Sequence, residues 1–336
     1  ENPGALHQLV ILCAASPWVA TQLARHPVLL DELLDARTLY NVPDKTYLRD
    51  ELQQQMLRIP MDDLEAHMDG LRYFKQAHQL NFYDDIKVYK PQDFSQKLRN
   101  RIQDLFKVGG RNRYYGYDVW RPEIINDFLN KIPENSILHY SDIGSHINYK
   151  GKWRLKDYVE NTQKNEMSVF EYGEPPKEIF RKQYKYQKYF EYEYTKCDVI
   201  NYFGLNKESI IFNSPQIWGG TFFLKKSKFS KKFMNDWEKA NIHTNLFDDS
   251  TSKIENHPKF KGMRGCQSVF SILSKLNNSY KFSASECEWA EHNNLRVWDH
   301  IYNYPILAKR DKRFNIFRRF INRQIKTINR LKSKLK

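Results

Sequence analysis

The sequence predicts an α/β domain that is preceded by an all-α segment and followed by a basic amphipathic helix. Three observations lead to this fold class. The composition changes near residue 80, apolar runs of strand length alternate with helical patterns between residues 81 and 308, and apolar residues recur every three or four positions in the basic segment 309–336. Strand-helix alternation favours a sheet with helices on its faces and ligands at the carboxyl ends of its strands.

The change near residue 80 is abrupt. Ala occurs 8 times before it and 4 times after it, whereas Asn occurs 2 and 24 times. The net charge is −4 for residues 1–80, +7 for residues 81–308 and +11 for residues 309–336, which together give the +14 of the chain. Such a shift is typical of two genes joined in one frame, although a helical domain followed by a β-rich one also shifts composition. We expect three parts with these bounds.

Composition also excludes several classes of protein. A chain of 336 residues with 40% hydrophobic content can build a core, which excludes intrinsic disorder and a disulfide-stapled mini-protein. The longest apolar run, Leu9 to Ala15, is far shorter than the ~18 residues of a membrane span. The four cysteines lie far apart, and the first residues lack the basic start and apolar core of a signal peptide. These features predict a reducing, cytoplasmic setting.

Residues 1–80 are predicted to be helical throughout. Apolar residues from Leu6 to Cys13 keep helical spacing, and the further helices expected are Trp18–Arg25, Val28–Leu34, Tyr47–Ile59 and Asp62–His78. This segment contains neither a Gly-rich phosphate loop nor a carboxylate pair with an obvious chemical task. We interpret it as packing material.

The α/β pattern begins after residue 80. Strands are expected at Ile86–Tyr89, Ile137–Tyr140, Ser168–Glu171 and Gly220–Leu224, and helices at Asp93–Phe106, Ile124–Leu129, Leu155–Asn161 and Cys266–Leu276.

The first candidate site residue is Asp142, which follows the second predicted strand. A carboxylate there can hold a divalent metal or a sugar hydroxyl, with Gly144 letting the backbone approach the ligand. Spacing alone favours a turn in which Asp142 caps a backbone N–H.

A second candidate site is the aromatic stretch 114–125. Arg121 directly precedes a predicted helix, and Gly116, Tyr117 and Trp120 lie close to it in the sequence. A guanidinium and free backbone N–H groups at a helix start can grip a diphosphate. An aromatic cluster with a stacked Arg explains the stretch equally well.

Two further stretches carry candidate residues. The pair Gly219-Gly220 before a strand permits close approach of a substrate, or forms an ordinary bulge or turn. Asp248 and Asp249 are adjacent carboxylates that suit metal binding, general-base chemistry or a solvated loop. Gln267 and Ser268 open a helix after Cys266, and a capping or buried thiol is a better interpretation of that cysteine than a nucleophile.

The helical block closely resembles part of the glutamine synthetase adenylyltransferases of enteric-type bacteria. The resemblance lies in the run ENPGALHQLVILCAASPWVATQLARHPVLLDELLDARTLY and in the later YLRDEL and FKQAHQL. It covers residues 1 to about 80, which correspond to a helical stretch ahead of a nucleotidyltransferase domain. The catalytic signature of that family, a Gly-Ser followed by paired aspartates, has no counterpart in this sequence.

Residues 81–300 resemble bacterial glycosyltransferases of the GT-A type from lipopolysaccharide and capsule gene clusters. The ordered stretches GYDVWRP, SDIGSHIN, GGTFF, DDSTSKIE and GCQSVFSIL carry the resemblance. It implies a GT-A-like, nucleotide-diphospho-sugar transferase fold with a mixed sheet. It also implies a nucleotide-sugar donor, Mn²⁺ or Mg²⁺, and a saccharide or glycolipid acceptor in surface polysaccharide synthesis.

The resemblance also implies roles for the candidate residues. Gly116, Tyr117, Trp120, Arg121 and Gly144 would lie at the nucleotide-sugar site. Asp142 would hold the metal or diphosphate, Asp249 and Gln267 would face donor or acceptor, and Gly219, Gly220, Asp248 and Ser268 would contact substrate. Cys266 replaces an Asp of the family pattern, and the first strand of the family is absent ahead of residue 82, so transfer is expected to be weak or absent.

The tail 309–336 holds 12 basic residues and one acidic residue. One apolar face and several basic faces predict a helix that lies on an anionic membrane surface, at the inner face of the cytoplasmic membrane. A solvated helix is an alternative, and a nucleic-acid patch is a less well supported one.

Three other hypotheses for the function of the chain stand beside the glycosyltransferase. They are a non-catalytic binding module, an accidental fusion of two reading frames, and a relative of glutamine synthetase adenylyltransferase without catalytic residues.

Overall fold

The computed structural model describes residues 61–109 and 114–309, together with seven residues between Val10 and Thr21. Its contacts divide the chain into two compact units, Glu1–Leu64 and Glu65–Lys336. The helices predicted before residue 60 lie almost wholly outside the described residues, and the tail after Lys309 lies outside them entirely. Among the described residues, no helix is long and apolar enough to cross a membrane.

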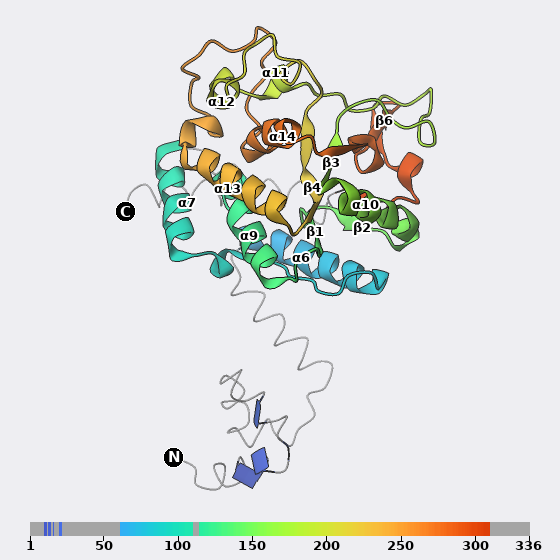
Figure 1. Ribbon diagram of the computed structural model, residues 1–336. Helices are drawn as coiled ribbons and strands as arrows, with labels where there is room; N and C mark the ends of the chain where they lie inside the picture. The colour runs from blue at the N-terminus through green and yellow to red at the C-terminus, as the bar shows by residue number, and fades with distance from the viewer. Residues whose placement is uncertain are drawn as a thin grey trace. The chain divides into compact units, whose positions relative to one another are not determined.

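The described elements follow the alternation that the sequence predicts (Figure 1). The α-helices are α6 (Met61–Leu80), α7 (Gln96–Gly109), α8 (Tyr114–Tyr117), α9 (Arg121–Lys131), α10 (Lys152–Asn165), α11 (Glu191–Tyr194), α12 (Cys197–Tyr202), α13 (Lys228–Ile242) and α14 (Cys266–Leu276). The strands are β1 (Ile137–Ser141), β2 (His146–Ile147), β3 (Met167–Glu171), β4 (Ile217–Lys225), β5 (Tyr280–Ser283), β6 (Ala290–His292), β7 (Leu295–Val297) and β8 (Ile306–Leu307). Short 3-10 turns include η3 (Thr244–Leu246).

The main sheet has the strand order β1-β4-β3-β5. Strand β4 runs antiparallel to β1 and β3, whereas β3 and β5 are parallel. Ser141 faces Thr221 and Glu171 faces Ile217, so the carboxyl ends of β1 and β3 lie at the edge where β4 begins. This edge is where the sequence places its candidate residues.

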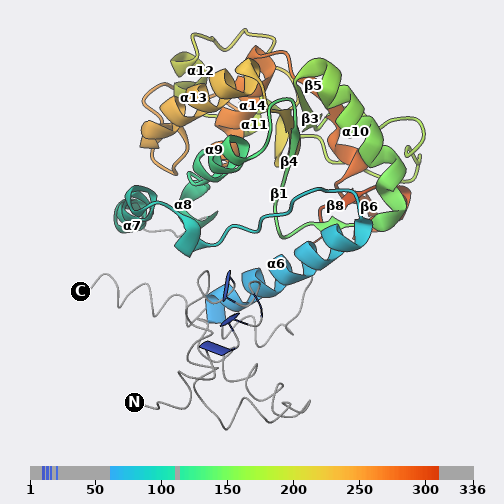
Figure 2. The same cartoon turned by 60° about the horizontal axis from the view of Figure 1, so that its bottom comes forward.

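Helices cover both faces of the sheet. On one face α14 contacts β4, and α13 lies against α14 and α9, while α10 covers the other face, as Figures 1 and 2 show. Successive residues of β4 therefore enter different cores. Phe222 packs with Trp237 and Phe270, and Phe223 packs with Tyr158 and Phe170. A strand buried on both faces explains the continuous apolar run of β4.

Residues 65–80 of helix α6 belong to the unit that contains the sheet. Arg72 donates to the backbone oxygens of Ser145 at 2.8 Å and Ile143 at 3.0 Å, directly after β1. Ala77 and Leu80 are buried in the same apolar cluster as residues of β2, β3 and α10. The helix thus caps the second core, and Figure 2 shows it running beside β1.

Most predicted elements are confirmed, including the helix Asp62–His78, the strand Ile137–Tyr140 and the helix Cys266–Leu276. The predicted strand Ile86–Tyr89 is wrong, because that segment pairs with no described strand and Tyr89 instead hydrogen-bonds Asp127. Strand β5 and helix α13 were not predicted. The GT-A assignment of the sheet and the domain bounds stay predictions.

Candidate functional site

The candidate site is built around Arg121, the first residue of α9. Its guanidinium lies at the sheet edge, where Nη2 donates to both carboxylate oxygens of Asp142 at 3.1 and 3.2 Å and Nη1 donates to the backbone oxygen of Gly219 at 3.1 Å. Arg121 is 6% exposed. Pro122 at the next position suits a helix start, because proline lacks the N–H that would have no partner there.

Charged and aromatic groups surround this guanidinium. Asp118 lies 3.4 Å from Nη2, and the rings of Trp120 and Tyr140 lie within 6 Å of the guanidinium carbon, at 5.8 and 5.6 Å. Burial lowers the pKa of Arg121, but the carboxylates of Asp118 and Asp142 outweigh burial and raise it well above its ordinary value. Tyr140 donates its hydroxyl to Asp142 at 2.7 Å. The guanidinium is therefore permanently charged, and both of its Nη atoms are engaged by the protein, whereas its buried Nε has no hydrogen-bond partner.

Gln267, from the first turn of α14, joins this pair to the interior. Its side-chain oxygen accepts from the N–H of Gly219 at 3.1 Å, and its amide donates to Gln216 at 2.9 Å. A Cβ at Gly219 would lie 3.0 Å from the Arg121 guanidinium and 3.2 Å from Gln267. Gly219 is glycine because two side chains close over it.

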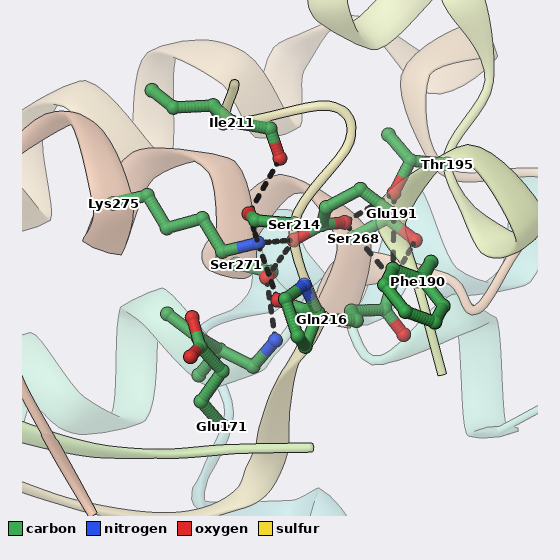
Figure 3. Close-up of polar contacts among 12 residues, drawn as sticks. Glu171, Phe190, Glu191, Thr195, Ile211, Ser214, Gln216, Ser268, Ser271 and Lys275 are labelled. Atoms are coloured by element: carbon green, nitrogen blue, oxygen red, sulfur yellow. Dashed lines mark hydrogen bonds and ion pairs between the residues drawn. The ribbon is translucent and has the colours of Figure 1, made fainter. Parts of the chain in front are cut away.

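Beyond Gln216 the polar network continues into the core (Figure 3). Gln216 approaches Glu191 at 3.3 Å, and Glu191 forms a buried ion pair with Lys275 at 2.8 Å. Ser268 donates to the backbone oxygen of Tyr194 at 2.7 Å. Burial lowers the pKa of Lys275. A continuous chain of polar contacts thus runs from Asp142 to Lys275, and Ser268 belongs to its buried part.

The remaining predicted site residues lie outside the side-chain network of Arg121. Asp248 accepts from Lys196 at 3.1 Å in a separate group after α13, and the neighbouring Asp249 is exposed. Gly144 lies in the turn closed by the Ser145 N–H and the Asp142 oxygen at 2.9 Å. At Gly220 a Cβ would meet the Trp218 indole at 2.3 Å, so this glycine serves packing.

The segment before Arg121 is unusually bent. Gly116, Tyr117 and Asp118 all have positive φ, at 78°, 57° and 62°. This left-handed conformation is costly for Tyr and Asp and natural for Gly. A Cβ on Gly116 would also press on Ile102 of α7 at 3.2 Å. The bend carries the Asp118 carboxylate to Arg121.

Asp142 and Cys266 are described residues for which metal or nucleophilic chemistry was considered. Within residues 61–109 and 114–309, no group of three His, Cys, Asp or Glu side chains could hold a metal ion. The Asp142 carboxylate, predicted as a metal ligand, is engaged by Arg121 and Tyr140. Cys266 is fully buried, and burial raises the pKa of its thiol, which keeps it protonated and unreactive.

Sequence reasoning missed an arginine enclosed by tyrosines. The guanidinium carbon of Arg264 lies 3.9 Å from the ring centre of Tyr189 and 4.0 Å from that of Tyr194. Tyr172, at the end of β3, donates to Glu288 at 3.1 Å, and burial raises the pKa of Glu288 to about 7 although Tyr172 and Arg264 oppose the shift. The dense tyrosines of residues 184–194 were the available signal.

Comparison with known proteins identifies only the first part of the chain. Residues 6–100 match the family of glutamate-ammonia ligase adenylyltransferases. The bifunctional glutamine synthetase adenylyltransferase/adenylyl-removing enzyme of Hahella chejuensis is 62% identical over 80 residues, 24% of this chain and 8% of that protein. The corresponding enzyme of Pseudomonas putida is 55% identical over 109 residues, 31% of this chain and 11% of that protein. The chain therefore spans about a tenth of the length of these relatives. No solved structure matches the chain.

These comparisons correct the predicted function. The resemblance of residues 1–80 to adenylyltransferases is confirmed. The prediction of a glycosyltransferase of lipopolysaccharide or capsule synthesis was wrong, because the matching family and relatives are adenylyltransferases and not sugar transferases. The nucleotide-sugar donor and the saccharide or glycolipid acceptor are withdrawn with it.

Proposed function

We propose that this chain is a non-catalytic relative of glutamine synthetase adenylyltransferases and that it binds glutamine synthetase without adenylylating it. The observation that carries the proposal is the 62% identity over 80 residues to an enzyme named for its action on glutamine synthetase. The matched segment lacks the Gly-Ser and paired aspartates expected of adenylyl transfer.

Helix α6 supplies a surface for such binding. One side of the helix, with Arg72, Gln76 and Ala77, faces the sheet-containing unit. On the opposite side Leu71 is 59% exposed and Phe74 is 38% exposed. Two large apolar side chains in the matched segment, one turn apart and open to solvent, form a compact docking patch.

Transfer and binding are tested separately. The purified chain is incubated with a bacterial glutamine synthetase, Mg²⁺ and ATP labelled on the α-phosphate, with a full-length adenylyltransferase as the positive control. We expect label on glutamine synthetase only in the control. Label transferred by this chain would overturn the non-catalytic part of the proposal.

Binding is measured by biolayer interferometry on immobilised glutamine synthetase. We expect saturable binding of the chain, weakened at least about tenfold by Phe74→Glu, because a charge in a desolvated apolar contact costs more than 1.4 kcal/mol. Leu295→Glu is the matched control, since Leu295 is 68% exposed and lies on β7. Absence of binding, or equal loss in both variants, would contradict the proposal.

A further inference from the structure

A cleft of about 380 Å³ opens between α12 and the residues around η3, and none of the residues described at the Arg121 site lines it. Asn201 and Tyr202 come from α12, His243 and Asn245 from the η3 region, and Lys253 from the loop that follows. Segments separated by about forty residues in the sequence thus converge on one hollow. This cleft plays no part in the proposed contact with glutamine synthetase.

The cleft presents hydrogen-bond donors that the protein does not use. Within the part of the chain that the structure describes, the side chains of Asn201, Asn245 and His243 make no hydrogen bond, and the ammonium of Lys253 makes no ion pair. Asp198, the carboxylate in the lining, is already satisfied by the backbone N–H groups of Lys253 and Ile254 at 3.0 to 3.1 Å. The Lys253 ammonium is thus a cation in the lining without a described ion pair, and the two amides and the imidazole beside it can donate hydrogen bonds, a combination that favours an anionic ligand.

The walls of the cleft are fixed by buried contacts. The Lys196 ammonium, almost fully buried, donates to the Asn245 backbone oxygen at 3.1 Å and to Asp248 at 3.1 Å. On the other side, Asn256 accepts from the N–H of Cys197 at 2.9 Å, at the start of α12. The backbone that carries Asn245 and the start of α12 is therefore in place before a ligand binds. This gives Asp248 a role, which is to position the cleft rather than to contact substrate.

We infer that this cleft binds a small molecule through an oxyanion, either a carboxylate or a phosphate. Lys253 and the amides of Asn201 and Asn245 contact the oxyanion. Tyr202, 39% exposed and 5.2 Å from the His243 ring, offers an aromatic surface to the remainder of the ligand, and Ile254, 37% exposed, adds apolar contact. A few placed polar groups beside apolar surface are what small-molecule sites require.

The test titrates the full chain with sodium phosphate and, separately, with sodium acetate, at constant pH and ionic strength maintained with sodium chloride. Isothermal titration calorimetry and the thermal unfolding midpoint are the two measurements. We expect one of the anions to bind saturably with a dissociation constant of about 1 mM or tighter. Saturation by phosphate alone identifies a phosphorylated ligand, and saturation by acetate alone identifies a carboxylate.

Variants assign the binding to the cleft. Lys253→Met keeps the backbone N–H that holds Asp198 and removes the ammonium, and we expect it to weaken binding about tenfold. Asn201→Ala, whose side chain supports no described contact, should weaken binding less. Lys259→Met, an exposed lysine in the same loop region, is the matched control and should change nothing. The inference is overturned if neither anion saturates by about 10 mM, or if the Lys253 and Lys259 variants bind equally.

Discussion

Arg121 carries the charge balance of the sheet edge, since it faces both Asp118 and Asp142. Arg121→Met removes a buried cation that contacts both of these carboxylates, and we expect a loss of about 3 kcal/mol in unfolding free energy. Urea unfolding followed by circular dichroism measures the loss. The matched control is Lys131→Met on the same helix, because its pair with Asp127 is exposed and is worth less than about 1 kcal/mol. Equal losses would contradict the assignment.

Glu288 gives stability a pH dependence of defined sign. Its pKa is raised by burial to about 7 in the folded chain, against an ordinary 4.5. Between these values the unfolded chain ionises first, so stability falls as pH rises from about 4.5 through about 7, by roughly 3 kcal/mol, and is constant at higher pH as far as Glu288 is concerned. Urea unfolding at pH 5 and pH 8 should show this fall in the wild type and a smaller fall in Glu288→Gln.

The control for this pH dependence is Glu255→Gln, because the side chain of Glu255 is 93% exposed. That variant should keep the wild-type difference between pH 5 and pH 8. Tyr172, Arg264 and Arg296 are the polar and charged groups that act on Glu288. If the fall in stability survives in Glu288→Gln unchanged, another group is responsible.

For single residues, the sequence predicted which ones lie at the sheet edge but not which contacts they make there. Arg121, Asp142, Gly219 and Gln267 were all proposed as site residues, and the structure brings them together. Their mutual pairing could not be foreseen, because it depends on a distance between β1 and α9 that spacing does not encode. Arg264 was not proposed as a site residue, since its tyrosine partners lie about seventy residues earlier.

Helices α11 and α14 are joined by the buried pair of Glu191 and Lys275, which anchors residues 190–215 to the core. Either single change, Glu191→Leu or Lys275→Met, should destabilise the chain by about 3 to 5 kcal/mol, because the remaining charge is buried without its partner. The double variant should lose clearly less than the sum of the two single losses. A double-mutant cycle from urea unfolding measures the difference, and additive losses would contradict direct coupling.

Helices and strands were predictable where the sequence has a long, regular pattern of apolar residues. The apolar run of β4 and the amphipathic α14 are examples. Strand β5 was missed because a four-residue edge strand with two exposed positions has too short a pattern, and α13 because its lysines obscure the apolar stripe. The segment Ile86–Tyr89 has strand-like residues but pairs with no described strand, so propensity alone failed.

For the whole molecule, composition and packing divide the chain at different places. Composition changes near residue 80, but the contacts group residues 65–80 with the sheet. The apolar cluster that contains Leu80 also contains Leu155 of α10 and Phe170 of β3. If two sequences were joined here, the second acquired a helix from the first as part of its core. Residues 65–80 of the segment that matches adenylyltransferases are then packed into the core of the sheet-containing unit.

This dependence predicts the result of two truncations. A chain of residues 65–336 should unfold cooperatively, whereas residues 81–336 should lose at least about 4 kcal/mol, since burial of Leu80 is worth roughly 2 kcal/mol and each charge-assisted hydrogen bond of Arg72 adds about 1.5 or more. That loss is a large share of the 5 to 15 kcal/mol typical of a domain. Within the chain of residues 65–336, Arg72→Met should lower the unfolding free energy by part of the same amount. Lys75→Met, a change of an exposed residue on the same helix, should leave it unchanged. Urea unfolding of the four proteins measures these differences. Equal stability of the two truncated chains would mean that the contacts of α6 do not stabilise the sheet domain and that this domain begins after residue 80.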